Sequence, residues 1–286
     1  MDKTTSAILL ISAPDKEGLV FTITEYIFQN KGNILHAEQH IDPVNNIFFM
    51  RIEWDLSHFL IQKENILSSL QSIKKHWNMD LKLYFSDSLI KTAVFVSRDD
   101  HCLHDLLYKI KNSELAMDVQ LIVSNHQDNE TIAGYYQTPF YFFPMFRENK
   151  KEQEQAQMKL LTDHGVELII LARYMQILTP GFVRAYPQQI INVHHSFLPA
   201  FIGANPYKQA YDRGVKVLGS TAHYVTEALD DGPIIAQQVV NINHKDSLQN
   251  YIEKGKELEK QVLSFAIKKH IERKILVYQN KTVVFD

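Results

Sequence analysis

The first 86 residues alternate between short apolar runs and longer stretches that carry apolar side chains at helical spacing. The short runs have the length and the alternation of β-strands, whereas the longer stretches fit amphipathic helices. Gly32 stands where the first helix should end, since glycine readily takes the conformation of a helix C-cap. The expected order is βαββαβ, that of a ferredoxin-like unit. The expected strands are residues 7–13, 33–42, 46–57 and 80–87, and the expected helices are residues 19–31 and 59–77.

From about residue 90 the pattern restarts, and buried apolar runs now alternate with amphipathic helices. Such alternation predicts an open α/β sheet of mostly parallel strands, Rossmann-like in type. We therefore expect two domains, residues 1–86 and residues 90–286. The expected strands of the second domain are residues 91–97, 118–126, 140–144, 166–175, 189–195, 216–226 and 233–242, and its expected helices are residues 102–112, 151–165, 205–213 and 247–271.

Length, charge and cysteine content narrow the class of protein. A chain of 286 residues has room for about two domains. The formal net charge is -3, so no basic excess attracts nucleic acid, and we expect no nucleic-acid partner. The single cysteine, Cys102, cannot form an intrachain disulfide, which favours a reducing compartment. The apolar run Ala7–Ala13 is too short to span a membrane, so we expect a cytoplasmic protein without membrane contact.

The first candidate catalytic residues occur at the end of a predicted strand, in the sequence INVHHSFLP, residues 191–199. Asn192 and His194 share one face of a strand, while Val193 and His195 share the other. The carboxyl end of a strand is where open α/β sheets bind ligands. An amide and an imidazole aimed at one point would make an oxyanion site. The alternative is a polar strand end that only satisfies loop backbone.

A second candidate is the acidic loop around Asp230, which lies between two apolar strands. The carboxylate of Asp230 could hold His194 and activate water, or the Asp-Asp-Gly sequence could be an ordinary turn. His194, His195, His223 and Asp230 are all possible metal ligands. However, adjacent residues on a strand point apart, and no helical pair of histidines is present, so we predict no metal site.

Residues 191–240 resemble the formyltransferase superfamily that uses 10-formyltetrahydrofolate, over a long stretch without gaps. The resemblance implies that Asn192, His194 and Asp230 are catalytic. Residues 171–183, LARYMQILTPGFV, resemble the segment whose backbone holds the pterin ring. This implies that Met175, Gln176, Ile177 and Leu178 bind the substrate, and we expect His223 and Glu227 to contribute to the same site. The role of His195 stays open, and His223 could line the water site or satisfy a loop carbonyl.

The acceptor of the formyl group decides the reaction within that superfamily. Glycinamide ribonucleotide transformylases hold a phosphate with a glycine-rich loop after the first strand, but residues 96–107 contain no glycine here. Asp99 and Asp100 would repel a phosphate, although either could simply cap the following helix. The chain also has no room for the RNA-binding domain of methionyl-tRNA formyltransferases. Water is then the expected acceptor.

The N-terminal half supports this expectation, because residues 15–42 resemble an ACT domain, a regulatory module for small ligands. The combination resembles the formyltetrahydrofolate deformylase family over nearly the full chain. That implies hydrolysis to formate and tetrahydrofolate, with the formate used in purine synthesis, and no bound cofactor or metal. Two alternatives stay open: a formyltransferase with a non-phosphorylated amine acceptor, and a catalytically silent amino-acid sensor.

The loop before the first helix is the candidate effector site. By resemblance to ACT modules, it would bind methionine or glycine through Asp15, Lys16, Gly18 and Leu19. The alternative is a plain turn in which Asp15 caps the helix. Because ACT domains commonly pair with one another, we also expect a homo-oligomer.

Overall fold

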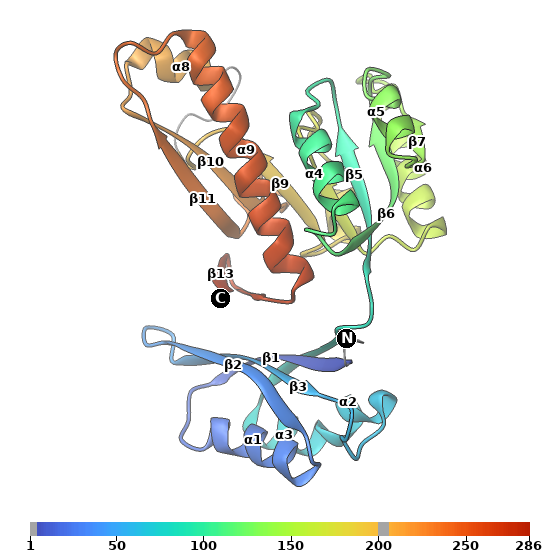
Figure 1. Cartoon of the computed structure of the whole chain (residues 1–286), viewed down its shortest axis with the longest axis vertical. Coiled ribbons are helices and arrows are strands. Elements are labelled where there is room, and N and C mark those ends of the chain that lie inside the picture. The colour runs from blue at the N-terminus through green and yellow to red at the C-terminus, as the bar shows by residue number, and fades with distance from the viewer. Residues whose placement is uncertain (1–4, 200–205) are drawn as a thin grey trace. The chain divides into compact units, whose positions relative to one another are not determined.

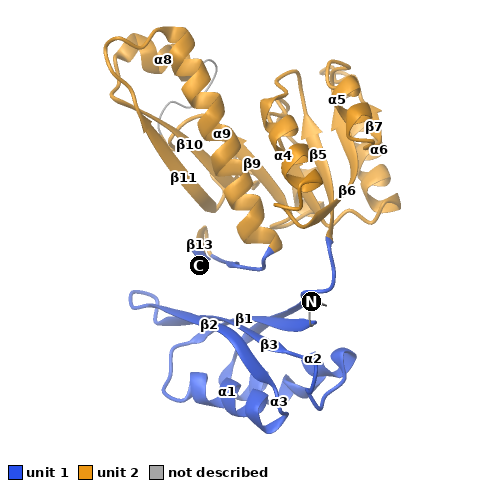
Figure 2. Ribbon diagram, viewed as in Figure 1, with its two compact units in different colours: residues 1–89, 272–278, 283–286 blue, residues 90–271, 279–282 orange. Residues whose placement is uncertain are grey.

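The computed structural model describes residues 5–199 and 206–286. The chain divides into two compact units (Figure 2). The first unit comprises residues 1–89, 272–278 and 283–286, and the second comprises residues 90–271 and 279–282. The boundary between the units therefore follows residue 89. At the end of the chain, residues 272–278 and 283–286 belong to the first unit and residues 279–282 to the second. Within the described residues, no helix is both long and apolar enough to cross a membrane.

The first unit contains a four-stranded antiparallel sheet in the order β2-β3-β1-β4. This is the sheet order of a ferredoxin-like unit. Helices α1 and α3 lie on one face of the sheet (Figure 1), where Ile11, Ile23 and Trp54 are fully buried. Leu276 and Phe285, from the end of the chain, pack on Leu10 and Phe49. The elements are β1 (Ser6–Pro14), α1 (Leu19–Gln29), β2 (Asn33–Asp42), β3 (Ile47–Asp55), η1 (Lys63–Asn65), α2 (Ile66–Ser69), α3 (Gln71–Trp77) and β4 (Asp80–Phe85).

Three local expectations for this unit were wrong. The stretch 59–77 is not one helix but the three short pieces η1, α2 and α3. The first helix ends at Gln29 with Asn30 as its C-cap, and Lys31 rather than Gly32 takes the left-handed conformation. Asp15 does not cap this helix, because its N-cap is Gly18 and no side chain caps it. Gly18 itself has a φ of 94°, and Leu19 is buried behind it.

The second unit contains a seven-stranded sheet in the order β11-β10-β9-β8-β5-β6-β7. Strands β7, β6, β5, β8 and β9 pair in parallel, whereas β10 is antiparallel to both β9 and β11. The expected mostly parallel sheet is thus confirmed. The strands are β5 (Ile90–Val96), β6 (Met117–Ser124), β7 (Phe140–Phe142), β8 (Leu168–Leu171), β9 (Ile190–His194), β10 (Val217–Tyr224) and β11 (Ile234–Asn241).

Helix α9 packs against β9, β10, β11 and α4 (Figure 1). Two short helices, α5 and α7, were not expected. Strand β8 ends at Leu171, four residues earlier than expected, so Met175–Leu178 lies in the loop after it. The helices are α4 (His101–Lys111), α5 (Glu130–Tyr135), α6 (Lys150–Asp163), α7 (Pro180–Ala185), α8 (Pro206–Arg213) and α9 (Leu248–Ile271), and a two-stranded sheet of β12 (Ile275–Tyr278) and β13 (Lys281–Val284) follows.

Candidate active site

The antiparallel pairing of β9 and β10 brings two polar side chains together. Asn192 and His223 are direct partners in this ladder, and Nδ2 of Asn192 lies 3.2 Å from Nε2 of His223. Nδ1 of His223 lies 2.9 Å from the carbonyl oxygen of Tyr224. A carbonyl only accepts, so Nδ1 must carry the hydrogen and Nε2 is free to accept from the amide of Asn192.

The burial of His223 agrees with that tautomer. Its side chain is almost fully buried, and this burial lowers the pKa of the imidazole, while the contact with Tyr224 and the charge of Asp230 only partly oppose the shift. A neutral ring with one donor and one acceptor therefore fixes which end of the Asn192 side chain carries N–H groups. His223 donates to a carbonyl at the end of β10 rather than in a loop, and it lines the cavity described below, so its role at the water site stays a prediction.

His194 and Asp230 form the second contact of the site. Nδ1 of His194 lies 3.3 Å from Oδ2 of Asp230. Burial alone would raise the pKa of Asp230, but the hydrogen bond and charge of His194 lower it overall, so this carboxylate is ionised at neutral pH. Nε2 of His194 is buried and has no hydrogen-bond partner within the described part of the chain. With Nδ1 directed at a carboxylate, Nε2 is the nitrogen that can give or take a proton.

The turn that carries Asp230 is held close to the end of β10. Asp230 has a φ of 54°, a left-handed conformation that Asp tolerates better than most residues. Two residues later, a Cβ atom on Gly232 would lie 1.7 Å from the carbonyl oxygen of Tyr224. Only glycine permits this approach, and Tyr224 N–H donates to the carbonyl of Pro233 at 2.9 Å. The sequence Asp-Asp-Gly-Pro is therefore a turn, as one alternative held, and it also seats the carboxylate against His194.

A cavity of about 350 Å³ joins these groups. Its walls include all nine residues that the sequence assigned to catalysis and substrate binding, although their roles stay predictions. The residues that sequence analysis did not single out include Arg173, Tyr174, Val225 and Leu229. Arg173 could have been noticed, because it is the first charged residue after the buried run of β8. The nine assigned residues are Met175, Gln176, Ile177, Leu178, Asn192, His194, His223, Glu227 and Asp230.

The loop Met175–Leu178 gives the cavity an apolar edge. The side chains of Met175 and Ile177 are more than half exposed, whereas Leu178 is buried. Part of the loop backbone is already committed, since Met175 N–H donates to Oγ of Ser97 at 2.9 Å and the Ile177 carbonyl accepts from Nζ of Lys150. These contacts hold the loop in place beside the cavity.

His195 follows the last residue of β9 and lines both this cavity and a second one that Tyr207 also lines. Its ring contacts those of His194 and Tyr207, with centroids 5.1 and 5.8 Å apart. Burial, assisted by the positive charge of Arg173, lowers the pKa of His195 to about 4. His195 is therefore a neutral part of the cavity wall at physiological pH.

The aspartates after β5 make no side-chain capping hydrogen bond to α4. Asp100 is the N-cap residue, but its side chain makes no capping hydrogen bond. Asp99 accepts a hydrogen bond of 3.0 Å from the guanidinium of Arg173 and lies 3.7 Å from Nζ of Lys256. The capping interpretation was wrong, because the charge of Asp99 is used to hold Arg173.

Among the described residues, one group has the spacing of metal ligands, namely His101, Cys102 and Glu259. The four possible ligands weighed from the sequence, His194, His195, His223 and Asp230, form no such group among the described residues. Arg173 Nε lies 3.4 Å from the carboxylate of Glu259, so a cation is already in contact with this group. Burial raises the pKa of the Cys102 thiol well above its usual value, which disfavours the thiolate that metals bind. The donor set does not fit a divalent metal.

A family model, a sequence relative and solved structures all relate this chain to enzymes of formyl-group chemistry. Residues 90–267 match the family model described as formyl transferase. The chain is 46% identical to a formyltetrahydrofolate deformylase from Synechocystis, over 98% of each protein. The crystal structure of a formyltetrahydrofolate deformylase from Pseudomonas syringae has a TM-score of 0.97 at 38% identity, covering 100% of this chain and 96% of the other. A glycinamide ribonucleotide transformylase from Symbiobacterium toebii has a TM-score of 0.66 at 27% identity, covering 72% of this chain and 98% of the other.

Proposed function

The chain belongs to the formyltetrahydrofolate deformylase family, and on that premise we propose that it hydrolyses 10-formyltetrahydrofolate to formate and tetrahydrofolate in the cavity beside β9. The observation that best supports this site is the convergence of Asn192, His194 and Asp230 on one cavity. An amide donor, an imidazole and a carboxylate are the groups that transfer of an acyl group to water requires.

In the proposed mechanism, water attacks the formyl carbon on N10. The amide of Asn192 donates to the developing oxyanion, and protonated His194 donates to it through Nε2. Asp230 orients the imidazole through Nδ1 and takes the proton of the attacking water through a second water molecule. The proton taken by Asp230 passes to N10 as the bond from N10 to the formyl carbon breaks, and the formic acid released loses its acidic proton to solvent. Since these side chains supply both the oxyanion donors and the proton relay, the proposed reaction needs no metal or prosthetic group.

The loop Met175–Leu178 would receive the pterin ring. Met175 and Ile177 present apolar side chains at the edge of the cavity, and flat aromatic ligands bind well against such surfaces. Glu227, on the opposite loop, is held by Arg184 at 2.8 Å and would contact a polar edge of the folate. His223 would act through Asn192 rather than on the substrate directly.

We further propose that the first unit is an ACT-like regulatory domain whose loop Asp15–Leu19 binds methionine or glycine. Its ferredoxin-like sheet order and the exposed side chains of Lys16 and Glu17 support this proposal. Formate release measured with and without each amino acid would test it. An unchanged rate for the full chain, together with no binding by calorimetry, would contradict it.

A homo-oligomer through the first unit is also proposed. Among the described residues β2 is an edge strand that pairs with β3, and Phe21 and Phe28 are exposed on α1. Sedimentation of the unmodified chain and of the variant Phe28→Ser would test this interface. We also propose that the chain works in the cytoplasm, where the released formate would serve purine synthesis.

The test of the proposed reaction is to supply 10-formyltetrahydrofolate alone and to measure formate. A deformylase releases formate and tetrahydrofolate in equal amounts without any amine. A transferase stays silent until an amine acceptor is added, and that outcome would contradict the proposal.

A further inference from the structure

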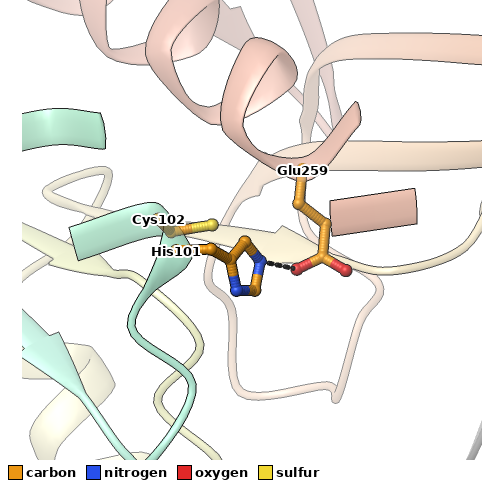
Figure 3. Close-up of side chains that lie close together, drawn as sticks. All are labelled: His101, Cys102 and Glu259. Carbon is orange, nitrogen blue, oxygen red and sulfur yellow. Dashed lines mark hydrogen bonds and ion pairs between the residues drawn. The ribbon is translucent and has the colours of Figure 1, made fainter. Parts of the chain in front are cut away.

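A buried group of charges adjoins the reaction cavity, and the proposed mechanism makes no use of it. Its centre is Glu259 of α9, whose side chain is fully buried. One oxygen of this carboxylate lies 2.9 Å from Nε2 of His101, and the other accepts a hydrogen bond from the hydroxyl of Tyr207. Figure 3 shows His101 directed at the carboxylate, with Cys102 beside it.

Arg173 connects this group with the cavity. Its Nε lies 3.4 Å from Oε2 of Glu259, and another guanidinium nitrogen donates to Asp99 at 3.0 Å. Arg173 is also part of the cavity wall that includes Asn192 and His194. A single guanidinium therefore contacts two carboxylates and also lines the space in which the reaction is proposed to occur.

Both Arg173 and Glu259 are charged. Burial alone would raise the pKa of Glu259, but the hydrogen bond from His101 and the charge of Arg173 lower it overall. Burial would lower the pKa of Arg173, but the charges of Glu259 and Asp99 raise it overall. An ionised carboxylate with no access to water must be matched by a cation or by strong hydrogen bonds. Glu259 has hydrogen bonds from His101 and Tyr207, and Arg173 is a cation in contact with it.

We infer that Arg173 is a specificity residue: its guanidinium occupies the position at which the buried carboxylate of Glu259 would otherwise hold a cationic amine, so that only water attacks the formyl group. This inference rests on the proposed hydrolysis of 10-formyltetrahydrofolate. Its ligand class is the primary alkylammonium ion, which resembles the arginine head group in charge and in its N–H donors.

A transferase on this scaffold needs a way to hold its amine. Most simple amines are cations at neutral pH, so a buried carboxylate at the cavity wall would concentrate them there. The transformylase from Symbiobacterium toebii has the same fold with a TM-score of 0.66, so the scaffold by itself does not decide between an amine and water as acceptor. Arg173 removes the anionic site by neutralising it within the chain.

After removal of Arg173, the expected reaction transfers the formyl group from N10 to the amine. The bound alkylammonium loses one proton to solvent and becomes a neutral amine. Its nitrogen lone pair attacks the formyl carbon, and the bond from that carbon to N10 breaks. The second proton lost by the attacking nitrogen goes to N10, through His194 or Asp230. The products are an N-formyl amine and tetrahydrofolate, and no oxidant or other reactant is needed.

The test uses the full chain, 10-formyltetrahydrofolate and methylamine, with N-methylformamide measured by mass spectrometry. Arg173→Ala should form at least about tenfold more N-methylformamide than the unmodified chain. Arg173→Lys keeps a cation beside Glu259 and should stay near the unmodified level. Arg98→Ala removes an exposed arginine from the loop after β5 and is the matched control. A folded Arg173→Ala protein that forms no additional N-methylformamide would overturn the inference.

A double variant separates charge from space. Arg173→Ala with Glu259→Gln opens the same volume but removes the carboxylate, so formylation of methylamine should return to the unmodified level. If the double variant formylates methylamine as well as the single variant does, the carboxylate does not hold the amine and the inference is wrong.

Failure to fold is also decisive. If Arg173→Ala is unstable, methylammonium should raise its melting temperature more than tetramethylammonium at equal concentration, because only methylammonium donates N–H groups to Glu259. Equal effects of both cations would show that Arg173 is only structural. Formate release by the unmodified chain without methylamine is measured separately. If no formate is released, the proposed function is rejected. If formate is released but Arg173→Ala forms no additional N-methylformamide, only this inference is rejected.

Discussion

Asn192 and His223 face each other across the β9–β10 ladder, with the amide nitrogen of Asn192 3.2 Å from Nε2 of His223. The second nitrogen of His223 is committed to the carbonyl of Tyr224. The imidazole therefore acts as a fixed acceptor that holds the Asn192 amide in one orientation. In the proposed reaction, this contact would direct the remaining N–H of Asn192 at the developing oxyanion.

Replacement of His223 should separate this positioning role from simple packing. His223→Leu keeps bulk but offers no acceptor, so kcat should fall by about 10²-fold, the effect of losing one oxyanion donor. His223→Gln offers an amide oxygen to Asn192 and should retain activity within roughly tenfold of the unmodified chain. KM should change little in either variant, since the contact acts on the transition state. Equal losses for Leu and Gln would contradict the role.

Gly232→Ala should displace the turn that carries Asp230. The added Cβ would meet the carbonyl oxygen of Tyr224 at 1.7 Å, so the backbone must move. We expect a loss of about 1–3 kcal/mol in the free energy of unfolding, measured with urea, together with a lower kcat. Gly134→Ala in α5 is the matched control, because no atom of the described residues lies within 4 Å of its Cβ position. The control should be neutral or stabilising by about 0.4–1 kcal/mol.

The neutral state of His195 predicts a specific pH dependence of stability. Its folded-state pKa of about 4 lies below the ordinary 6.5, because burial and then Arg173 disfavour the charged ring, while Glu259 and Asp230 only partly oppose them. Between these values the unfolded chain binds a proton that the folded chain does not, so stability falls as pH falls from 6.5 to about 4. The contribution is at most about 3 kcal/mol.

Urea unfolding of the full chain and of His195→Gln, at about pH 7 and about pH 4.5, measures that contribution. The variant should lose less stability on acidification, because it lacks the imidazole that must stay neutral in the folded state. The carboxylates around the site are present in both proteins, so their contribution cancels in the comparison. An identical loss in both would show that His195 is not held neutral by the fold.

Most of the architecture could be predicted from the sequence, because the apolar patterns that mark strands and helices are local. Apolar runs predicted every described strand of the large sheet, and the carboxyl-end rule directed attention to Asn192 and His194, which line the cavity. The stretch 59–77 was misassigned because its apolar spacing is helical, although Leu70 breaks it into separate pieces as the C-cap of α2 and N-cap of α3. Helix α7 was missed although Thr179 caps it and Pro180 opens it, a combination that marks helix starts.

Contacts between distant residues could not be predicted from spacing. Arg173 and Glu259 are separated by 86 positions, and nothing in either local pattern pairs them. Asp99 likewise contacts the distant residue Arg173, so its local pattern suggested a helix cap although its side chain makes no capping hydrogen bond. The partner of Asn192 required the antiparallel register of β9 and β10, which is set by the packing of the whole sheet.

The central claim is that His194 and Asp230 act as one catalytic unit in the cavity that also contains Asn192. Its most direct test is formate release from 10-formyltetrahydrofolate by His194→Ala, Asp230→Asn and the double variant. Asn tolerates the left-handed backbone of residue 230, so the turn should persist. Each single change should lower kcat by about 10²–10⁴-fold, and the double variant should be no more than about tenfold below the worse single variant. Single variants with near-normal rates, or losses that multiply in the double variant, would contradict the claim.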